Sequence, residues 1–269
     1  MRGDTPLVLP CIRASQRETM RGSELLAVIG GSGLSGLANL QVRQREVART
    51  PYGEPSGPLT RGALGGREIV FLARHGYGHT IPPHQVNYRA NIWALKEAGV
   101  RGVVSVASVG GIRADLGPGV LLVPDQIIDY TSGRRSTFFD GGDAPVTHVD
   151  FTHPYTQSLR TRILQAGRNC GEPLIDGGVY AATQGPRLES AAEINRLERD
   201  GADMVGMTGM PEAALARELG LEYAAIAVVA NYAAGRGDSA QAVSLERIEA
   251  VLAESMQRVR RIIETLVLS

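Results

Sequence analysis

Residues 25–36 read LLAVIGGSGLSG, a short apolar run followed directly by a glycine-rich turn. An apolar run of this length that ends at glycine is typical of a strand buried on both faces. Similar runs recur along the chain and alternate with amphipathic helical patterns. This alternation predicts an α/β fold, with a mixed, largely parallel central sheet flanked by helices.

The remaining strands are predicted from short apolar runs of the same kind. Several are apolar on both faces, which suits strands that helices cover on either side. The predicted strands are Leu25–Ile29, Glu68–Ala73, Gly102–Ala107, Val120–Ile128, Gly178–Ala182, Met204–Met207 and Tyr223–Ala230. Residues 62–72 also have the pattern of a hairpin arm that turns at Gly65-Gly66.

Helices are predicted from their ends and from apolar residues at helical spacing. The end signals are serine caps, a proline at a first helical position and glycines just past the last turn. The predicted helices are Gln85–Ala98 before Gly99, Ala191–Glu198 behind a capping box at Ser190, Glu212–Leu219 between Pro211 and Gly220, and a long final helix capped by Ser244.

The 269 residues carry 28 basic and 28 acidic side chains, so the formal net charge is zero. Such a chain lacks the broad positive field that nucleic-acid binding needs, and no apolar run reaches the roughly 18 residues of a membrane-spanning helix. Cys11 and Cys170 lie far apart, which favours a cytoplasmic protein over a disulfide-linked one. We expect one domain over residues 24–269, preceded by a loosely ordered leader over residues 1–23.

The segment Thr131–Pro154 matches no predicted helix or strand. It is long for a connection without a role. We expect either a lid over a site or a contact between subunits, and the sequence favours neither.

Candidate binding residues follow the predicted strands. Ser32 lies in the first glycine turn, Arg74-His75 follows the second strand, Ser108 precedes Gly110-Gly111, and Thr208 precedes Gly209. Hydroxyls, glycine amides, a guanidinium and an imidazole are suited to one oxyanion of phosphate size. Taken alone, Arg74 is more typical of a surface ion pair with an acid, and His75 of local packing. The prediction of an oxyanion site therefore depends on all of these residues occurring together.

The glycine turn also permits a different function. Gly31, Gly33 and Gly36 match the GxGxxG fingerprint of dinucleotide-binding folds. However, residues 47–52 hold no carboxylate for a ribose diol, and no clear helical pattern follows Gly36. A nicotinamide-dependent oxidoreductase therefore remains a distant alternative.

Two polar residues are candidates for binding a ring that has both a donor and an acceptor on one edge. Asn231 leaves the last buried strand, and its carboxamide offers both a donor and an acceptor. Glu189 follows Gly185-Pro186-Arg187-Leu188 and could supply a second contact. The alternatives are that Asn231 caps a turn and that Glu189 is an ordinary acid at a helix N-terminus.

The sequence argues against a metalloenzyme and a triad hydrolase. It contains no His-Glu-x-x-His motif and no Gly-x-Ser-x-Gly elbow, and its five histidines lack ligand spacing. We expect no metal.

Taken together, these motifs give the chain a resemblance to the trimeric purine nucleoside phosphorylase and methylthioadenosine phosphorylase family. The resemblance implies a single-domain nucleoside phosphorylase fold, a homotrimer, and phosphorolysis of a purine nucleoside with inorganic phosphate as co-substrate and no organic cofactor. It spans almost everything from Leu25 onward and rests on GGSG at 30–33, LARHGYGHTIPPHQVNYRANIWALKEAGV at 72–100, VGGIRADLGPG at 109–119, TQGPRLES at 183–190, DMVGMTGMPEAALARELG at 203–220 and AVS at 242–244.

The resemblance also assigns roles by position. The implied phosphate ligands are Ser32, Arg74, His75, Ala107, Ser108 and Thr208, and the implied substrate-binding residues are Leu188 at the base, Met207 at the sugar, and Asn231, Tyr232 and Ala233. Ala107-Ser108 departs from the Thr-Ala or Asn-Ala pair of relatives. A phosphate contact there is therefore either lost or replaced by Ser108 and main-chain donors.

Two further departures concern the substrate. Methylthioadenosine phosphorylases have Thr-Asp-Tyr-Asp where this chain has Ala230-Asn231-Tyr232-Ala233. An aspartate accepts from the 6-amino group of adenine, whereas an asparagine donates to N7 or to a 6-oxo group, as in the 6-oxopurine relatives. Leu245 lies where ordinary purine nucleoside phosphorylases use a histidine for the 5′-hydroxyl, and an apolar side chain suits a thioether methyl.

We therefore expect phosphorolysis of S-methyl-5′-thioinosine to hypoxanthine and 5-methylthioribose 1-phosphate, with Asn231 as the catalytic residue and Glu189 and Leu245 setting specificity. The alternatives are an S-methyl-5′-thioadenosine phosphorylase, a general 6-oxopurine nucleoside phosphorylase, and a nucleoside-binding protein without activity.

Overall fold

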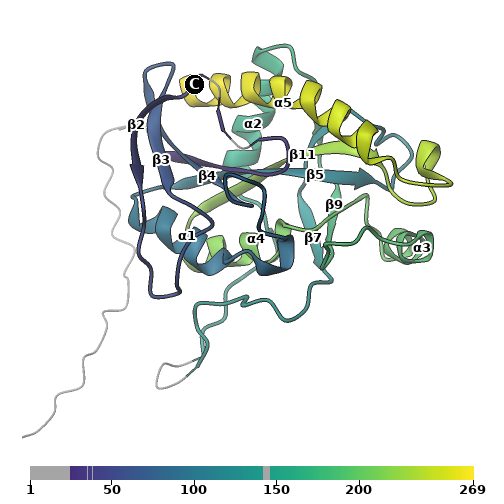
Figure 1. Cartoon of the computed structure of the whole chain (residues 1–269), viewed down its shortest axis with the longest axis horizontal. Helices are drawn as coiled ribbons and strands as arrows, with labels where there is room; N and C mark the ends of the chain where they lie inside the picture. Colours follow the sequence, from purple (N-terminus) through teal and green to yellow (C-terminus); the bar gives the residue numbers. More distant parts are fainter. Residues whose placement is uncertain (1–24, 35, 38, 142–145) are drawn as a thin grey trace, which may run out of the picture.

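The computed structural model describes residues 25–34, 36–37, 39–141 and 146–269. The predicted leader over residues 1–23 lies outside the described residues. One eleven-stranded sheet forms the centre of the fold, and helices cover both of its faces (Figure 1). This architecture confirms the predicted α/β class.

The sheet runs in the order β2-β3-β4-β1-β5-β10-β9-β7, with β11 paired to β5 and β6, and β6 paired to β8. Most pairs are parallel, and the β3–β4 hairpin is antiparallel, as predicted. The strands are β1 Leu26–Gly30, β2 Gln41–Glu46, β3 Leu59–Leu64, β4 Arg67–Ala73, β5 Gly102–Gly111, β6 Leu121–Val123, β7 Gln126–Asp129, β8 Ile175–Asp176, β9 Val179–Ala182, β10 Met204–Gly206 and β11 Glu222–Tyr232.

Helices α2 and α5 pack on one face of the sheet, and α1 and α4 pack on the other (Figure 1). Each face has its own apolar core, because the central strands are buried on both sides. The helices are α1 Tyr88–Glu97, α2 Gln157–Asn169, α3 Ala191–Arg199, α4 Gly209–Glu218 and α5 Leu245–Leu268, with short 3-10 turns at Pro83–Gln85 and Gly237–Ser239. Among the described residues, no helix is long and apolar enough to cross a membrane.

The helix signals in the sequence are largely confirmed. Ser190 accepts from the backbone N–H of Glu193, which completes the predicted capping box, and Ser244 caps α5. Met210 has an extended backbone (φ −117°, ψ 142°), so regular helical geometry in α4 begins at Pro211. The first helix, predicted from Gln85, begins at Tyr88 because Asn87 is its cap.

The predicted strand Val120–Ile128 is wrong in one respect, since it consists of two strands. β6 pairs antiparallel with β11, whereas β7 pairs parallel with β9. Pro124 lies between them and has no N–H to donate to a sheet ladder. Three elements were not predicted: β2 is exposed and polar, β8 has two residues, and the apolar positions of α2 are separated by polar ones.

The register brings the candidate turns to one edge of the sheet. Gly30 at the end of β1 pairs with Ala73 at the end of β4, so Ser32 and Arg74-His75 emerge side by side. In β11, an irregularity between Val229 and Asn231 places Asn231 opposite Gly110 of β5. The carboxyl ends of parallel strands are where α/β folds bind ligands.

Candidate functional site

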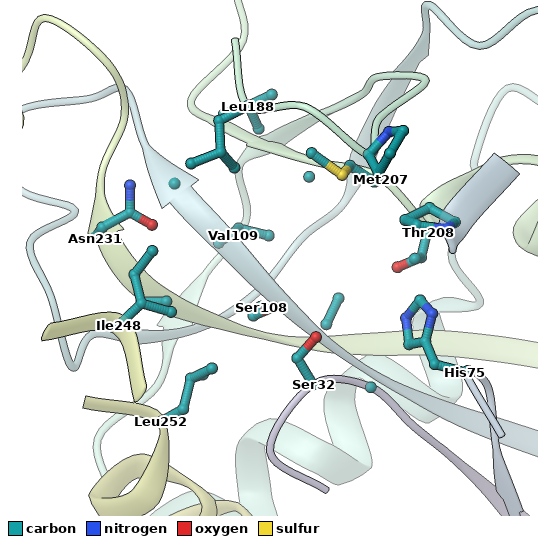
Figure 2. A pocket seen from close by; sticks show the side chains of 18 of the residues that line it. Ser32, His75, Ser108, Val109, Leu188, Met207, Thr208, Asn231, Ile248 and Leu252 are labelled. Carbon is teal, nitrogen blue, oxygen red and sulfur yellow. The ribbon is translucent and has the colours of Figure 1, made fainter. Parts of the chain in front are cut away.

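A cavity of about 630 Å³ opens at this edge of the sheet (Figure 2). A volume of this size is typical of small-molecule sites. The predicted residues that line it are Ser32, Arg74, His75, Ala107, Ser108, Leu188, Glu189, Met207, Thr208, Asn231, Ala233 and Leu245. The structure therefore brings together twelve of the thirteen residues singled out from the sequence.

Tyr232 is the exception, since it is absent from the described residues that line the cavity. Its side chain lies over two glycines: a Cβ on Gly117 would be 2.8 Å from Tyr232 Oη, and a Cβ on Gly237 would be 2.5 Å from its Cδ2. Successive side chains of a strand point to opposite sides. Asn231 faces the cavity, whereas the Tyr232 side chain packs against these glycines, so the structure does not group Tyr232 with the other twelve residues, and its contact with substrate stays a prediction.

The polar groups gather at two ends of the cavity. Figure 2 shows Ser32, His75 and Thr208 grouped at one end and the Asn231 carboxamide at the other, with Met207 and Leu188 along one wall. Ser32 Oγ lies 3.5 Å from His79 Nε2, and Ser108 also lines the cavity. This arrangement separates an anion-binding end from an end suited to a polar ring.

Arg74 is fully buried and already paired. Its Nε donates to Glu212 Oε2 at 2.7 Å and its Nη2 donates to Glu212 Oε1 at 2.9 Å. Nη2 also donates to Ser105 Oγ and Nη1 donates to the Val106 carbonyl, so one Nη1 hydrogen remains for a ligand. Burial alone lowers the pKa of Arg74, but the charge and hydrogen bonds of Glu212 outweigh it and raise the pKa.

Arg74 Nη1 lies beside Gly31, and both residues belong to the cavity lining. Arg74 Nη1 lies 3.0 Å from the position that a Cβ on Gly31 would occupy, and the Val106 carbonyl oxygen lies 2.5 Å from it. Any side chain at this position would collide with the backbone of β5. The glycine is needed here for close approach, so this part of the GxGxxG match has a packing cause unrelated to a dinucleotide.

His75 is neutral near neutral pH. Burial, followed by the charge of Arg74, lowers its pKa to about 4. Its Nδ1 lies 2.8 Å from the Ile81 carbonyl oxygen, which can only accept, so Nδ1 carries the hydrogen and Nε2 is the acceptor. The His79 ring lies against the same ring with centroids 4.6 Å apart and planes tilted by 50°, and His79 has a left-handed backbone (φ 52°), rare for a residue other than glycine.

Asn231, at the other end, and Glu189 both line the cavity with part of their polar capacity free. Asn231 Nδ2 donates to the Tyr232 carbonyl at 2.6 Å, which leaves one amide hydrogen and the amide oxygen. Thr183 Oγ1 donates to Glu189 Oε1 at 2.6 Å, which orients the carboxylate. Neither residue is only a cap, although α3 does begin shortly after Glu189, at Ala191.

The wall near Leu245 is apolar and comes mostly from α5. Leu245, Ile248 and Leu252 line the cavity together with Val243, and Leu245 is 66% exposed at the mouth. Only Leu245 was singled out from the sequence. The spacing of i, i+3 and i+7 places the three α5 residues on one helix face, a pattern that predicts a helix and not a binding wall.

The segment 131–154 contributes no lining residue among its described parts, 131–141 and 146–154. The lid interpretation finds no support in this single chain. Residues 131–141 are instead held against the body: Thr137 Oγ1 and the Phe138 N–H both donate to Glu218 at 2.7 Å, and the Phe138 ring packs against Tyr52.

The glycine turn, the buried arginine, the neutral histidine and the polar far end together define a site for an oxyanion beside a second, ring-bearing ligand. Residues 25–268 match the model of the phosphorylase superfamily, so the chain belongs to that family. This membership confirms the resemblance drawn from the sequence.

Several individual members of the family are similar to this chain. The chain is 55% identical over 234 residues to a probable S-methyl-5′-thioinosine phosphorylase of Pseudomonas syringae, covering 87% of this chain and 94% of that protein. It is 48% identical to the 6-oxopurine nucleoside phosphorylase of Pyrococcus furiosus, covering 78% and 80%. Among solved structures, methylthioadenosine phosphorylase from Schistosoma mansoni in complex with adenine superposes with a TM-score of 0.87 at 32% identity, covering 91% of each chain.

Proposed function

We propose that this protein is a purine nucleoside phosphorylase that cleaves S-methyl-5′-thioinosine with inorganic phosphate. The observation that carries the proposal is that one cavity is lined by an amide, Asn231, by a carboxylate, Glu189, and by an apolar wall that includes Leu245. The relatives at 55% identity that are named for this reaction support it.

The base end suits hypoxanthine. The free amide hydrogen of Asn231 can donate to N7 of the ring, and the amide of an asparagine can also meet O6. The Glu189 oxygen that Thr183 leaves free can accept from the N1–H that a 6-oxopurine carries and adenine lacks. Since a buried polar group without a partner costs about 1–3 kcal/mol, this donor and acceptor pattern disfavours a 6-aminopurine.

The apolar wall suits the methylthio group. Val243, Leu245, Ile248 and Leu252 offer no hydrogen bond to a 5′-hydroxyl but pack against a thioether methyl. One apolar group gained or lost in such a pocket is worth roughly 1–3 kcal/mol. The preference for methylthioinosine over inosine is therefore expected to be moderate rather than absolute.

The opposite end receives phosphate. Ser32, Ser108 and Thr208 supply hydroxyls, and Arg74 supplies its one free Nη1 hydrogen. His75 Nε2 is an acceptor, so it takes a hydrogen bond from a protonated phosphate oxygen. Ala107, the other residue of the altered turn, lines the cavity with its main chain and methyl group only.

The reaction follows from this placement. A phosphate oxygen forms a bond to the anomeric carbon while the bond from that carbon to the purine nitrogen breaks, and the purine takes the bonding pair. The purine anion then takes up one proton from solvent, and the phosphate ester loses the proton that hydrogen phosphate carried, so the products are neutral hypoxanthine and the sugar phosphate. The sugar gains positive charge and the purine gains negative charge in the transition state. Asn231 then donates to a ring that is more negative than in the substrate, so its hydrogen bond acts most strongly at that point.

A substrate panel tests the function. We expect hypoxanthine release from methylthioinosine that requires phosphate, slower release from inosine, and much slower release of adenine from methylthioadenosine. Faster release of adenine would favour the methylthioadenosine alternative, and equal rates on both 6-oxopurines would favour a general phosphorylase. Binding of NADH with no phosphate-dependent reaction would support an oxidoreductase instead.

The proposal includes a cytoplasmic homotrimer without metal or organic cofactor. The family resemblance supports the trimer, and the irregular segment 131–154 is the stretch expected to meet a neighbouring subunit. Light scattering behind size exclusion measures the oligomer directly, and activity that survives a chelator would support the absence of a metal.

A further inference from the structure

Arg134 lies in the irregular segment between β7 and α2, and its half-buried guanidinium is surrounded by acceptors. It also lies 5.5 Å from the centre of the Tyr88 ring. The hydrogen bonds are from Nε to Gln184 Oε1 at 3.2 Å, from Nη1 to the carbonyls of Met207 at 2.8 Å and Met210 at 2.6 Å and to Tyr88 Oη at 3.3 Å, and from Nη2 to the carbonyls of Thr183 at 3.2 Å and Gln184 at 2.8 Å.

The four backbone carbonyls belong to two segments that line the cavity. Thr183 and Gln184 lead directly into the segment that contributes Pro186, Leu188 and Glu189 to the cavity lining, whereas Met207 lines the cavity and Met210 precedes the helical part of α4. One planar guanidinium therefore joins both segments, with Nη2 on one and Nη1 on the other. Among the described residues, Arg134 itself is not part of the cavity lining, so it does not touch a ligand there.

A short chain of contacts connects Arg134 to Glu189, which is proposed to bind the purine base. Nη2 holds the Thr183 carbonyl, and the Thr183 hydroxyl donates to Glu189 Oε1 at 2.6 Å. The Thr183 N–H donates to the Gly206 carbonyl at 2.8 Å, which ties the same residue to the end of β10. The position of the Glu189 carboxylate thus depends on a backbone that Arg134 holds.

We propose that Arg134 is a positioning residue that sets the spacing between the base-binding segment 183–189 and the sugar-binding segment 207–210. The inference rests on the proposed function. Arginine suits this role because its rigid, planar guanidinium can donate hydrogen bonds to both segments at once. A lysine keeps the charge but has one nitrogen, which cannot serve carbonyls on both segments.

The test compares Arg134→Met and Arg134→Lys with the wild type. Arg135→Met is the matched control, because the Arg135 side chain is 76% exposed and its nearest acid, Asp140, is 4.0 Å away. For each variant, kcat and KM are measured for methylthioinosine and for methylthioadenosine at saturating phosphate, together with the midpoint of thermal unfolding.

We expect both Arg134 variants to raise the nucleoside KM and to lose kcat/KM on methylthioinosine by about 10²-fold, since a shift of about 1 Å in a binding group has effects of this size. The preference for the 6-oxopurine should fall, because Glu189 loses its support. A variant that only lost stability would contain less active enzyme, which lowers kcat equally for both nucleosides and leaves KM and the preference unchanged.

The inference would be overturned if Arg134→Lys lowered kcat equally for both nucleosides without changing KM or the preference. Wild-type kcat and KM in either Arg134 variant would also overturn it. If Arg134→Met does not fold, Arg134→Lys carries the test alone, since it retains the charge and most of the packing. The proposed function fails separately, in the wild type, if phosphate-dependent hypoxanthine release is absent. In that case the same comparison is made with whichever nucleoside the wild type cleaves.

Discussion

Replacing Asn231 by aspartate should reverse the choice between 6-oxo and 6-amino purines. The substitution keeps the shape of the side chain but removes both amide hydrogens. One of them bonds to the Tyr232 carbonyl at 2.6 Å, and the other is free to meet the purine. Asn231→Asp therefore places an acceptor against O6 and N7 of hypoxanthine, while it creates an acceptor for the 6-amino group of adenine.

The size of the effect follows from counting partners. Loss of the hydrogen bond to the leaving base and the new clash of acceptors together cost about 3 kcal/mol on methylthioinosine, roughly a 10²-fold fall in kcat/KM. A gained hydrogen bond of about 1 kcal/mol on methylthioadenosine widens the change in the ratio to about 10³-fold. The repulsion between the introduced carboxylate and the Tyr232 carbonyl affects both substrates equally, so it cancels in the ratio.

The assay is a pair of initial-rate series with methylthioinosine and methylthioadenosine at saturating phosphate, with hypoxanthine and adenine separated by chromatography. Asn231→Ala is the control, because it removes donor and acceptor alike and should slow both substrates without reversing the preference. An unchanged ratio in Asn231→Asp would refute the reasoning, since it would mean that this side chain does not meet the purine.

Three further outcomes are expected. Leu245→His, which places a donor at the apolar mouth, should shift the preference from methylthioinosine toward inosine by about tenfold, measured as the ratio of kcat/KM values. Glu212→Gln should lower the free energy of unfolding by about 3–5 kcal/mol in urea, because it leaves the fully buried Arg74 without its counter-charge; a loss below about 1 kcal/mol would contradict that. Since the pKa of His75 is lowered to about 4 from an ordinary 6.5, the unfolded chain binds the extra proton, and stability should fall by about 3 kcal/mol as pH drops from 6.5 to 4. His75→Asn should lack that part of the decline in urea titrations at each pH.

Three of the candidate residues could be predicted from the sequence because each lies just after a buried apolar run. Ser32, His75 and Thr208 are placed by the backbone register alone, so their convergence needs only the order of the strands. Glu189 was a candidate because it follows Gly185-Pro186-Arg187-Leu188, and the structure places it on the cavity wall just before α3. Local signals of this kind do not depend on distant contacts.

Partners that are distant in sequence could not be predicted. Glu212 pairs with Arg74 across 138 positions, and as a sequence it is only an acid in the first turn of α4. Arg134 lies in a segment without periodicity, and its acceptors are mostly backbone carbonyls, which carry no residue-type signal. Strand β2 was missed because a fully solvated edge has no apolar alternation to detect.

The buried pair of Arg74 and Glu212 has a consequence for turnover. Because Glu212 already neutralises the Arg74 guanidinium, the proposed phosphate end would hold an oxyanion through oriented hydrogen-bond donors, including one Arg74 Nη1 hydrogen, with little net charge behind them. Phosphate binding is therefore expected to depend only weakly on ionic strength. Charge attraction at this end is also expected to be too weak to retain the sugar phosphate once the glycosidic bond has broken.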